Sequence, residues 1–204
     1  MVFIIRESMK FTRIPESAFK ELVLNAGYLA TTFDPTAGTA PEESALLGAT
    51  TGGINFTAVP SFTDFGEDID NCPKNMKELK QIESWEVKCS GTYVSASPTN
   101  VKSMLGAADE TTTSNVSKIT PRDLKNSDFT DLWLLCDYSD KHGTTNGGFC
   151  AIHMINTLST GGFSLQTGDK AKGQMSFEYT AHYSITAQDT VPCEVYIKAG
   201  EDEA

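Results

Sequence analysis

The residues best suited to chemistry are three histidines, which could act as general bases or metal ligands. His142 lies in a run of turn-forming residues, whereas His153 and His182 lie in segments that we expect to be strands. None of them has a second ligand at a spacing typical of metal sites. The chain also lacks the nucleophile-elbow, zinc-protease and phosphate-loop motifs. We therefore expect a protein that is not an enzyme and that uses no metal or cofactor.

Two further patterns could bind ions. Acidic residues gather at Asp64, Glu67, Asp68 and Asp70, but they lack the spacing and the distal glutamate of a calcium loop. We interpret them as part of a solvated acidic loop. The pair Gly52–Gly53 could approach a phosphate, yet a lone glycine pair at the start of a strand is typical of a turn or bulge.

Composition narrows the class of protein. A chain of 204 residues suggests one domain, and its formal net charge of −11 disfavours a module that grips nucleic acid. That charge suits simple solubility, or a surface that lies beside DNA without binding it. The five cysteines form no C-x-x-C motif, so we expect free thiols in a reducing cytoplasm. No apolar run reaches the length of a membrane span, so no membrane partner is expected.

Hydrophobic alternation predicts a chain of short strands. The expected strands are Ile54–Ala58 (ended by Pro60), Trp85–Tyr93, Leu132–Cys136, Phe149–Leu158, Phe163–Thr167, Met175–Ile185 and Cys193–Ile197. One short helix is expected over Val101–Ala108, capped by Thr99 or Asn100, and Asp109–Ser117 is expected to be a polar loop. The predicted fold is mainly β: a barrel or sandwich of two packed antiparallel sheets, with one short α-helix on its side and a long inter-strand loop.

That long loop is residues 61–80. Gly66 and Pro73 argue against a continuous element there, and loops of this length in compact domains are usually functional or disordered. Its apolar residues are Phe62, Phe65, Ile69, Met76 and Leu79, and its charged residues include Asp64, Glu67, Asp68, Asp70, Lys74, Lys77 and Lys80. So many apolar side chains need a surface to cover, which is either the loop's own domain or a neighbouring molecule.

The order and spacing of five blocks resemble the major tail tube proteins of long-tailed phages. The blocks are Asn25–Pro35, Leu47–Ser97, Asn100–Asp109, Ile119–Asp140 and Lys170–Ile185. Residues 1–8 have no counterpart in that pattern, and Met9 resembles the family's beginning. We therefore interpret residues 1–8 as an extension and residues 9–204 as a single tail-tube domain, with an N-terminal arm over about residues 9–46.

The resemblance implies a structural role. Proteins of this kind are similar in fold to the tube protein of type VI secretion. Six subunits close a ring, and rings stack into a hollow tube that lets DNA pass without specific binding. The implied partners are further copies of the chain, a tape-measure protein, and tail terminator or baseplate proteins. The implied location is the virion tail, assembled in the host cytoplasm. Residues 61–80 would be the inter-ring stacking loop, and Glu178 is a candidate for the lumen wall.

Two other function classes remain open. A β-sandwich binding or adhesion module could use surface aromatics such as Tyr93 and Tyr196. A hydrolase on a jelly-roll scaffold would need a convergent histidine–carboxylate or metal cluster, which the sequence does not indicate. Electron microscopy distinguishes the first alternative from a tube subunit, because a binding module stays as discrete particles.

Overall fold

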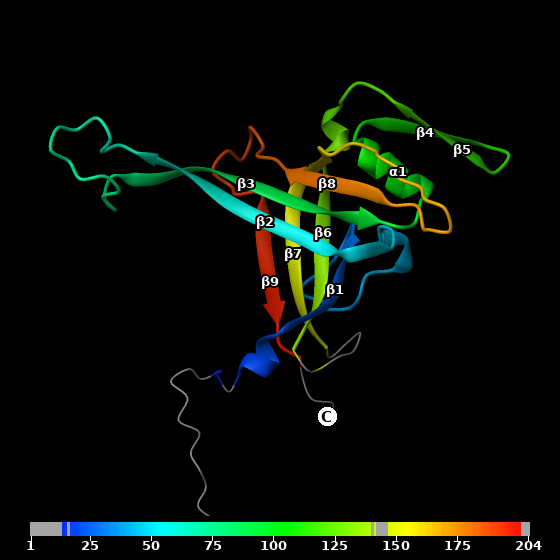
Figure 1. Cartoon of the computed structure of the whole chain (residues 1–204), viewed down its shortest axis with the longest axis horizontal. Coiled ribbons are helices and arrows are strands. Elements are labelled where there is room, and N and C mark those ends of the chain that lie inside the picture. The colour runs from blue at the N-terminus through cyan, green and yellow to red at the C-terminus, as the bar shows by residue number, and fades with distance from the viewer. Residues whose placement is uncertain (1–13, 16, 140, 142–146, 201–204) are drawn as a thin grey trace, which may run out of the picture.

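The computed structural model describes residues 14–15, 17–139, 141 and 147–200. Its main body is a curled antiparallel sheet that forms a half-barrel, with one α-helix and a small second sheet beside it (Figure 1). The mainly β fold predicted from sequence is therefore confirmed. The predicted extension at residues 1–8 and His142 lie outside the described residues.

The main sheet has seven strands in the order β1-β6-β7-β8-β3-β2, and β9 pairs with β7. Their bounds are β1 (Val23–Ala30), β2 (Thr50–Asp64), β3 (Lys80–Tyr93), β6 (Thr130–Tyr138), β7 (Gly148–Ser159), β8 (Met175–Ala181) and β9 (Cys193–Lys198). The second sheet is a hairpin of β4 (Ala108–Thr113) and β5 (Val116–Pro121). The helices are α1 (Pro98–Leu105) and three 3₁₀ turns, η1 (Ala18–Glu21), η2 (Glu43–Ala45) and η3 (Asn126–Asp128).

The sheet curls into two parts along strand β7, which pairs with different neighbours along its length. Along Phe149–Met154 it pairs with β9, and at Thr157–Ser159 it pairs with β8 instead. The main core fills the space between these parts, with Val87, Tyr93 and Phe177 from one side and Leu29 and Met154 from the other. A smaller cluster around Trp133 and Leu135 covers the opposite face of β6.

Several predicted boundaries are wrong. The helix begins at Pro98, because Ser97 caps it by accepting the Asn100 N–H, and a proline at the first helical position loses no hydrogen bond. Strand β2 continues through Pro60, which an edge strand tolerates because it needs no donor on its free side. The strand expected to reach Ile185 ends at Ala181, and Ile185 is exposed.

Two polar segments were also misassigned. The loop expected at Asp109–Ser117 is most of the β4–β5 hairpin, whose turn at Ser114 and Asn115 has positive φ at both residues. The strand expected over Phe163–Thr167 is absent from the described residues, where Gln166 and Gln174 form only an isolated bridge. Within the span assigned to an N-terminal arm, Val23–Ala30 is a full member of the main sheet.

Candidate functional site

The most conspicuous feature is the β2–β3 hairpin, which extends well beyond the half-barrel (Figure 1). Its strands pair from Thr50↔Tyr93 out to Asp64↔Lys80. Strand β8 supports β3 only from Lys88 to Tyr93, so the outer part of the hairpin is a two-stranded ribbon. Such a ribbon is marginally stable in water without a surface to pack on.

The turn of the hairpin is held by its own hydrogen bonds. Asp64 accepts the Gly66 N–H at Oδ1 (2.9 Å) and the Asn75 N–H at Oδ2 (3.0 Å), which gathers both ends of the turn onto one carboxylate. These two bonds lower the pKa of Asp64. The Lys80 ammonium donates to Asn75 Oδ1 at 3.2 Å and also lies 4.8 Å from the centre of the Phe62 ring. The turn is therefore an ordered element.

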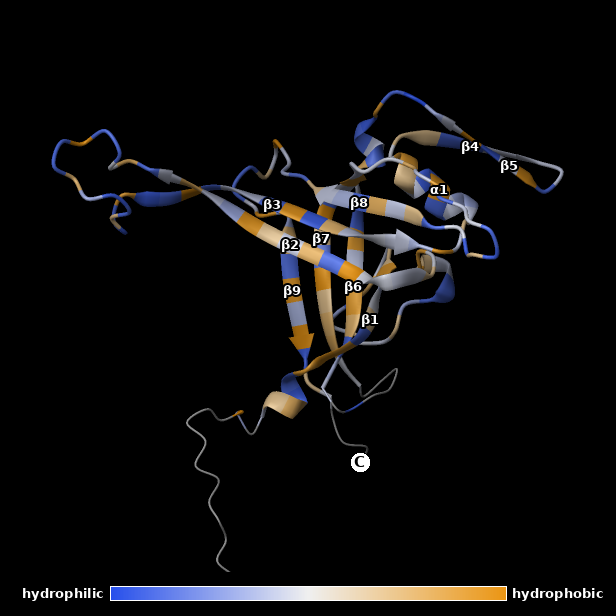
Figure 2. Ribbon diagram, viewed as in Figure 1, coloured by the Kyte–Doolittle hydropathy of each residue, from blue (hydrophilic) through white to orange (hydrophobic). Residues whose placement is uncertain are grey.

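Apolar side chains on this hairpin face solvent. Phe62 and Ile82 are opposite each other across the two strands, and both are about half exposed. Phe65, Ile69 and Met76 are exposed on the turn, with fractions between 39% and 57%. Figure 2 shows hydrophobic stretches interleaved with hydrophilic ones at the end of the hairpin. Together we call Phe62, Phe65, Ile69, Met76 and Ile82 the hairpin patch.

The structure corrects the predicted bounds of this loop. Residues 61–64 belong to β2 and Lys80 belongs to β3, so the excursion is residues 65–79. The predicted apolar residues are exposed except Leu79, which is half-buried, and the predicted charged residues are exposed except Asp64. Sequence reasoning missed Ile82, because its place opposite Phe62 depends on the register shift after Ser61.

Glu178, the residue predicted for the lumen wall, lies on the face of β8 that points away from the core. Its register partner is Ser90, and Lys88 lies diagonally from it on β3. Thr160 donates a hydrogen bond to Glu178 Oε1 at 3.1 Å. The same face of β2, β3 and β8 carries Asn55, Thr57, Val59, Ser61, Ser84, Glu86, Ser90, Thr92, Ser176 and Thr180. We call this face the polar wall. On it, the charges of Lys88 and Glu86 cancel in an ion pair, and Glu178 gives the wall one net negative charge.

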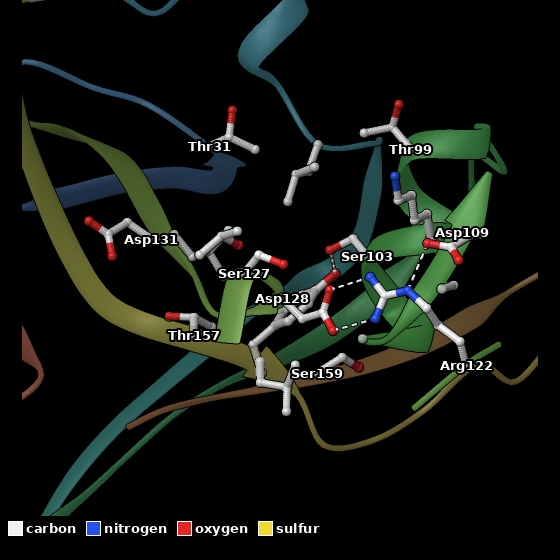
Figure 3. Close-up of a pocket in the computed structure, with 18 residues that line it drawn as sticks. Thr31, Thr99, Ser103, Asp109, Arg122, Ser127, Asp128, Asp131, Thr157 and Ser159 are labelled. Carbon is white, nitrogen blue, oxygen red and sulfur yellow. Dashed lines mark hydrogen bonds and ion pairs between the residues drawn. The ribbon is translucent and has the colours of Figure 1, made fainter. Parts of the chain in front are cut away.

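A cavity of about 450 Å³ opens between α1, the base of the β4–β5 hairpin and the ends of β6 and β7 (Figure 3). Arg122 lies in its wall and binds Asp128 with two hydrogen bonds of 2.7 Å, while its Nε donates to Asp109 Oδ1 at 2.7 Å. The guanidinium lowers the pKa of Asp128 to about 2. The charges of Arg122, Asp109 and Asp128 (the Arg122 triad) are thus paired with one another, and they connect the β4–β5 hairpin to η3. This arrangement favours a structural role for the three residues.

Two histidines, His153 and His182, lie in the described part of the chain. In the described ranges, no group of three His, Cys, Asp or Glu side chains could hold a metal ion. His182 contacts Asn156 and the Phe129 ring. His153 lies between Asp131 and Glu194 on neighbouring strands, a cluster that the sequence spacing does not reveal. Among the helices that the structure describes, none is long and apolar enough to cross a membrane.

The aromatic residues proposed for an adhesion surface are placed differently from the expectation. Tyr93 is fully buried in the main core, packed 4.3 Å from the Phe177 ring centre, so it cannot contact a partner. Its position in the strand alternation, on the face of Val87 and Cys89, is what buries it. Tyr196 is half-buried and donates a hydrogen bond to Glu194 at 2.6 Å.

No protein-family model matches the chain, and no curated protein matches it.

Proposed function

We propose that this chain is the structural subunit of a phage tail tube, in which copies form hexameric rings that stack into a hollow conduit for DNA. The observation that carries the proposal is the β2–β3 hairpin, a two-stranded ribbon that leaves its own half-barrel and exposes the apolar side chains of the hairpin patch. A monomer gains nothing from holding such a ribbon in water. A neighbouring ring would cover the hairpin patch, and the charged residues Glu67, Asp68, Asp70, Lys74 and Lys77 around it would set the register.

Unpaired sheet edges support the assembly into rings. In the described part of the chain, β2 pairs only with β3, and β9 pairs only with β7. Each therefore has one edge whose backbone groups are free to pair with another chain. Two such edges on one subunit allow head-to-tail pairing, which closes a ring when the rotation between copies fits.

The polar wall around Glu178 supports a lumen that DNA can slide past. Hydroxyl and amide side chains dominate this face, its one basic side chain, Lys88, is paired with Glu86, and the remaining net negative charge repels phosphates. We assign this wall to the inside of the tube. A tape-measure protein would fill the lumen, and terminator and baseplate proteins would close the ends, in a tail assembled in the host cytoplasm.

Electron microscopy of purified protein tests the proposal. We expect rings or tubes at high concentration from the full chain. A variant in which residues 65–79 are replaced by Asn-Gly keeps the Asp64↔Lys80 register in a two-residue hairpin. We expect this variant to keep its far-UV circular dichroism and to lose long tubes.

A matched control changes the other hairpin. Replacing Ser114–Asn115, the two-residue turn of β4–β5, by Asn-Gly should leave assembly intact. If the shortened β2–β3 variant still forms normal tubes, the hairpin is not the connector. Discrete particles from the full chain under all conditions would instead favour a β-sandwich binding module, for which the 450 Å³ cavity beside Arg122 is the candidate site.

A further inference from the structure

His153 lies at the centre of a polar cluster that spans three strands. Its Nε2 is 3.1 Å from Asp131 Oδ2 on β6, and its Nδ1 is 3.4 Å from Glu194 Oε2 on β9. The ring is stacked on Trp133, with centroids 4.1 Å apart and planes within 5°. His153 itself belongs to β7, the strand between the two carboxylates. The cluster therefore links the edge strand β9 to the interior of the sheet.

The two contacts cannot both be hydrogen bonds when the ring is neutral. A neutral imidazole carries one N–H and one acceptor nitrogen, whereas the imidazolium donates from both. A carboxylate is acceptor-only, so it gains nothing from an imidazole nitrogen that has no proton. The face of Trp133 also favours a cation over it. The full cluster therefore requires the protonated ring.

The geometry also indicates which contact is lost. Both carboxylates have a second donor: the Asn156 N–H bonds to Asp131 at 3.1 Å, and the Tyr196 hydroxyl bonds to Glu194 at 2.6 Å. The contact to Asp131 is the shorter of the two, and from this geometry we expect the proton of a neutral ring to stay on Nε2. Glu194 then keeps only its hydrogen bond from Tyr196, which is on the same strand, and β9 loses the side-chain contact between Glu194 and His153.

We propose that His153 is a proton-dependent latch that fastens edge strand β9 to β6: the imidazolium holds Asp131 and Glu194 together, and loss of its proton releases Glu194. This inference goes beyond the proposed tube function and does not depend on it. It concerns the strand whose free edge is available to another copy, so the state of the latch changes how firmly that edge is held.

Few charged or titratable groups face His153. Asp131 on β6 and Glu194 on β9 face His153, with Tyr196 behind Glu194 and Lys198 two same-face positions further along β9. Hydrogen bonds from Tyr196 and His153 lower the pKa of Glu194, and the bond to Glu194 raises the pKa of Tyr196. Glu194 thus stays ionised, and Tyr196 neutral, throughout the range of about pH 5–8 in which histidines change charge. Below that range, protonation of Glu194 also opens the latch.

Hydrogen exchange measures the latch directly. The full chain is exchanged at about pH 5.5 and about pH 8, and protection of the peptide covering β9 is corrected for intrinsic rates and normalised to β8. We expect protection of β9 to be about two- to fivefold lower at the higher pH, the size of a partly exposed ion pair. His153→Gln should show equal protection at both values, because glutamine does not titrate.

Two further measurements keep the outcome decisive. Glu194→Gln keeps the neighbouring Tyr196 and removes only the charge, so it should also abolish the pH dependence even if His153→Gln does not fold. Nitrogen NMR of the neutral ring should show the proton on Nε2. Unchanged β9 protection in the wild-type chain, the same pH dependence in Glu194→Gln, or a neutral ring protonated on Nδ1 would each overturn the latch.

Discussion

Truncating one side chain of the hairpin patch separates assembly from folding. Phe65 lies on the turn of the β2–β3 hairpin and is 57% exposed in the subunit. Phe65→Ser removes apolar surface that contributes little to the subunit's own core. We therefore expect the free energy of unfolding of the monomer to change by no more than about 0.5 kcal/mol.

The effect on assembly should be much larger. A phenylalanine side chain covers about 150–250 Å², so covering the exposed part of Phe65 removes about 85–140 Å² from water. At about 25 cal/mol per Å² this burial stabilises each contact by about 2–3.5 kcal/mol. Since 1.4 kcal/mol is about a tenfold change in an equilibrium constant, the critical concentration for tube formation should rise about 30- to 300-fold.

Sedimentation across a concentration series measures that critical concentration, and urea denaturation of dilute protein measures monomer stability. Val116→Ser is the matched control, because Val116 is 67% exposed at the turn of the other hairpin. It should leave both quantities unchanged. An unaltered critical concentration in Phe65→Ser, or an equal rise in Val116→Ser, would refute the assignment of the hairpin patch to the contact between rings.

Three other predictions concern the subunit itself. Leu29→Ala should lower the free energy of unfolding by about 2–5 kcal/mol in urea denaturation, because Leu29 is fully buried in the main core. Arg122 lowers the pKa of Asp128 from 3.8 to about 2. The contribution of Asp128 to stability is therefore present above pH 3.8 and is lost as the pH falls through about 2. Over this range the melting temperature of Asp128→Asn should vary less with pH than that of the wild type. Burial raises the pKa of Cys89 to about 12, so mass spectrometry should find Cys89 alkylated only after unfolding. Cys72, on the hairpin turn, should be alkylated first in the free subunit and should become protected from alkylation in tubes.

The strands that could be predicted are those whose side chains alternate between core and solvent. Met175 to Ala181 alternates buried and less buried residues without interruption, as the pattern requires. Strand β2 beyond Pro60 could not be predicted in this way, because its outer part has no core face and depends on pairing with β3. The β4–β5 hairpin also escaped prediction, since its threonines and serines are equally common in loops. Arg122 ties it to η3 through residues that are separate in sequence.

The candidate sites also differ in how far the sequence predicts them. An apolar and charged segment between two strands is visible in sequence, so a long connection could be predicted there, although its bounds are 65–79 and not 61–80. The His153 cluster could not be, because Asp131 and Glu194 are 22 and 41 residues away and meet His153 only through strand pairing. Tyr93 shows the opposite case: the half-polar strand predicts an aromatic residue on the surface, and the register places it in the core.

The contrast between the two hairpins is the strongest physical argument for a partner. The β4–β5 hairpin is anchored at its base by the Arg122 triad, and most of its side chains are polar, so it suits water as it is. The β2–β3 hairpin is longer, its outer part pairs with no third strand among the described residues, and it exposes the apolar side chains of the hairpin patch. Its turn is nevertheless ordered around Asp64. A two-stranded apolar ribbon is only marginally stable in water, so a surface that covers it would stabilise it, and a second copy of the chain is the surface that the proposed tube would supply.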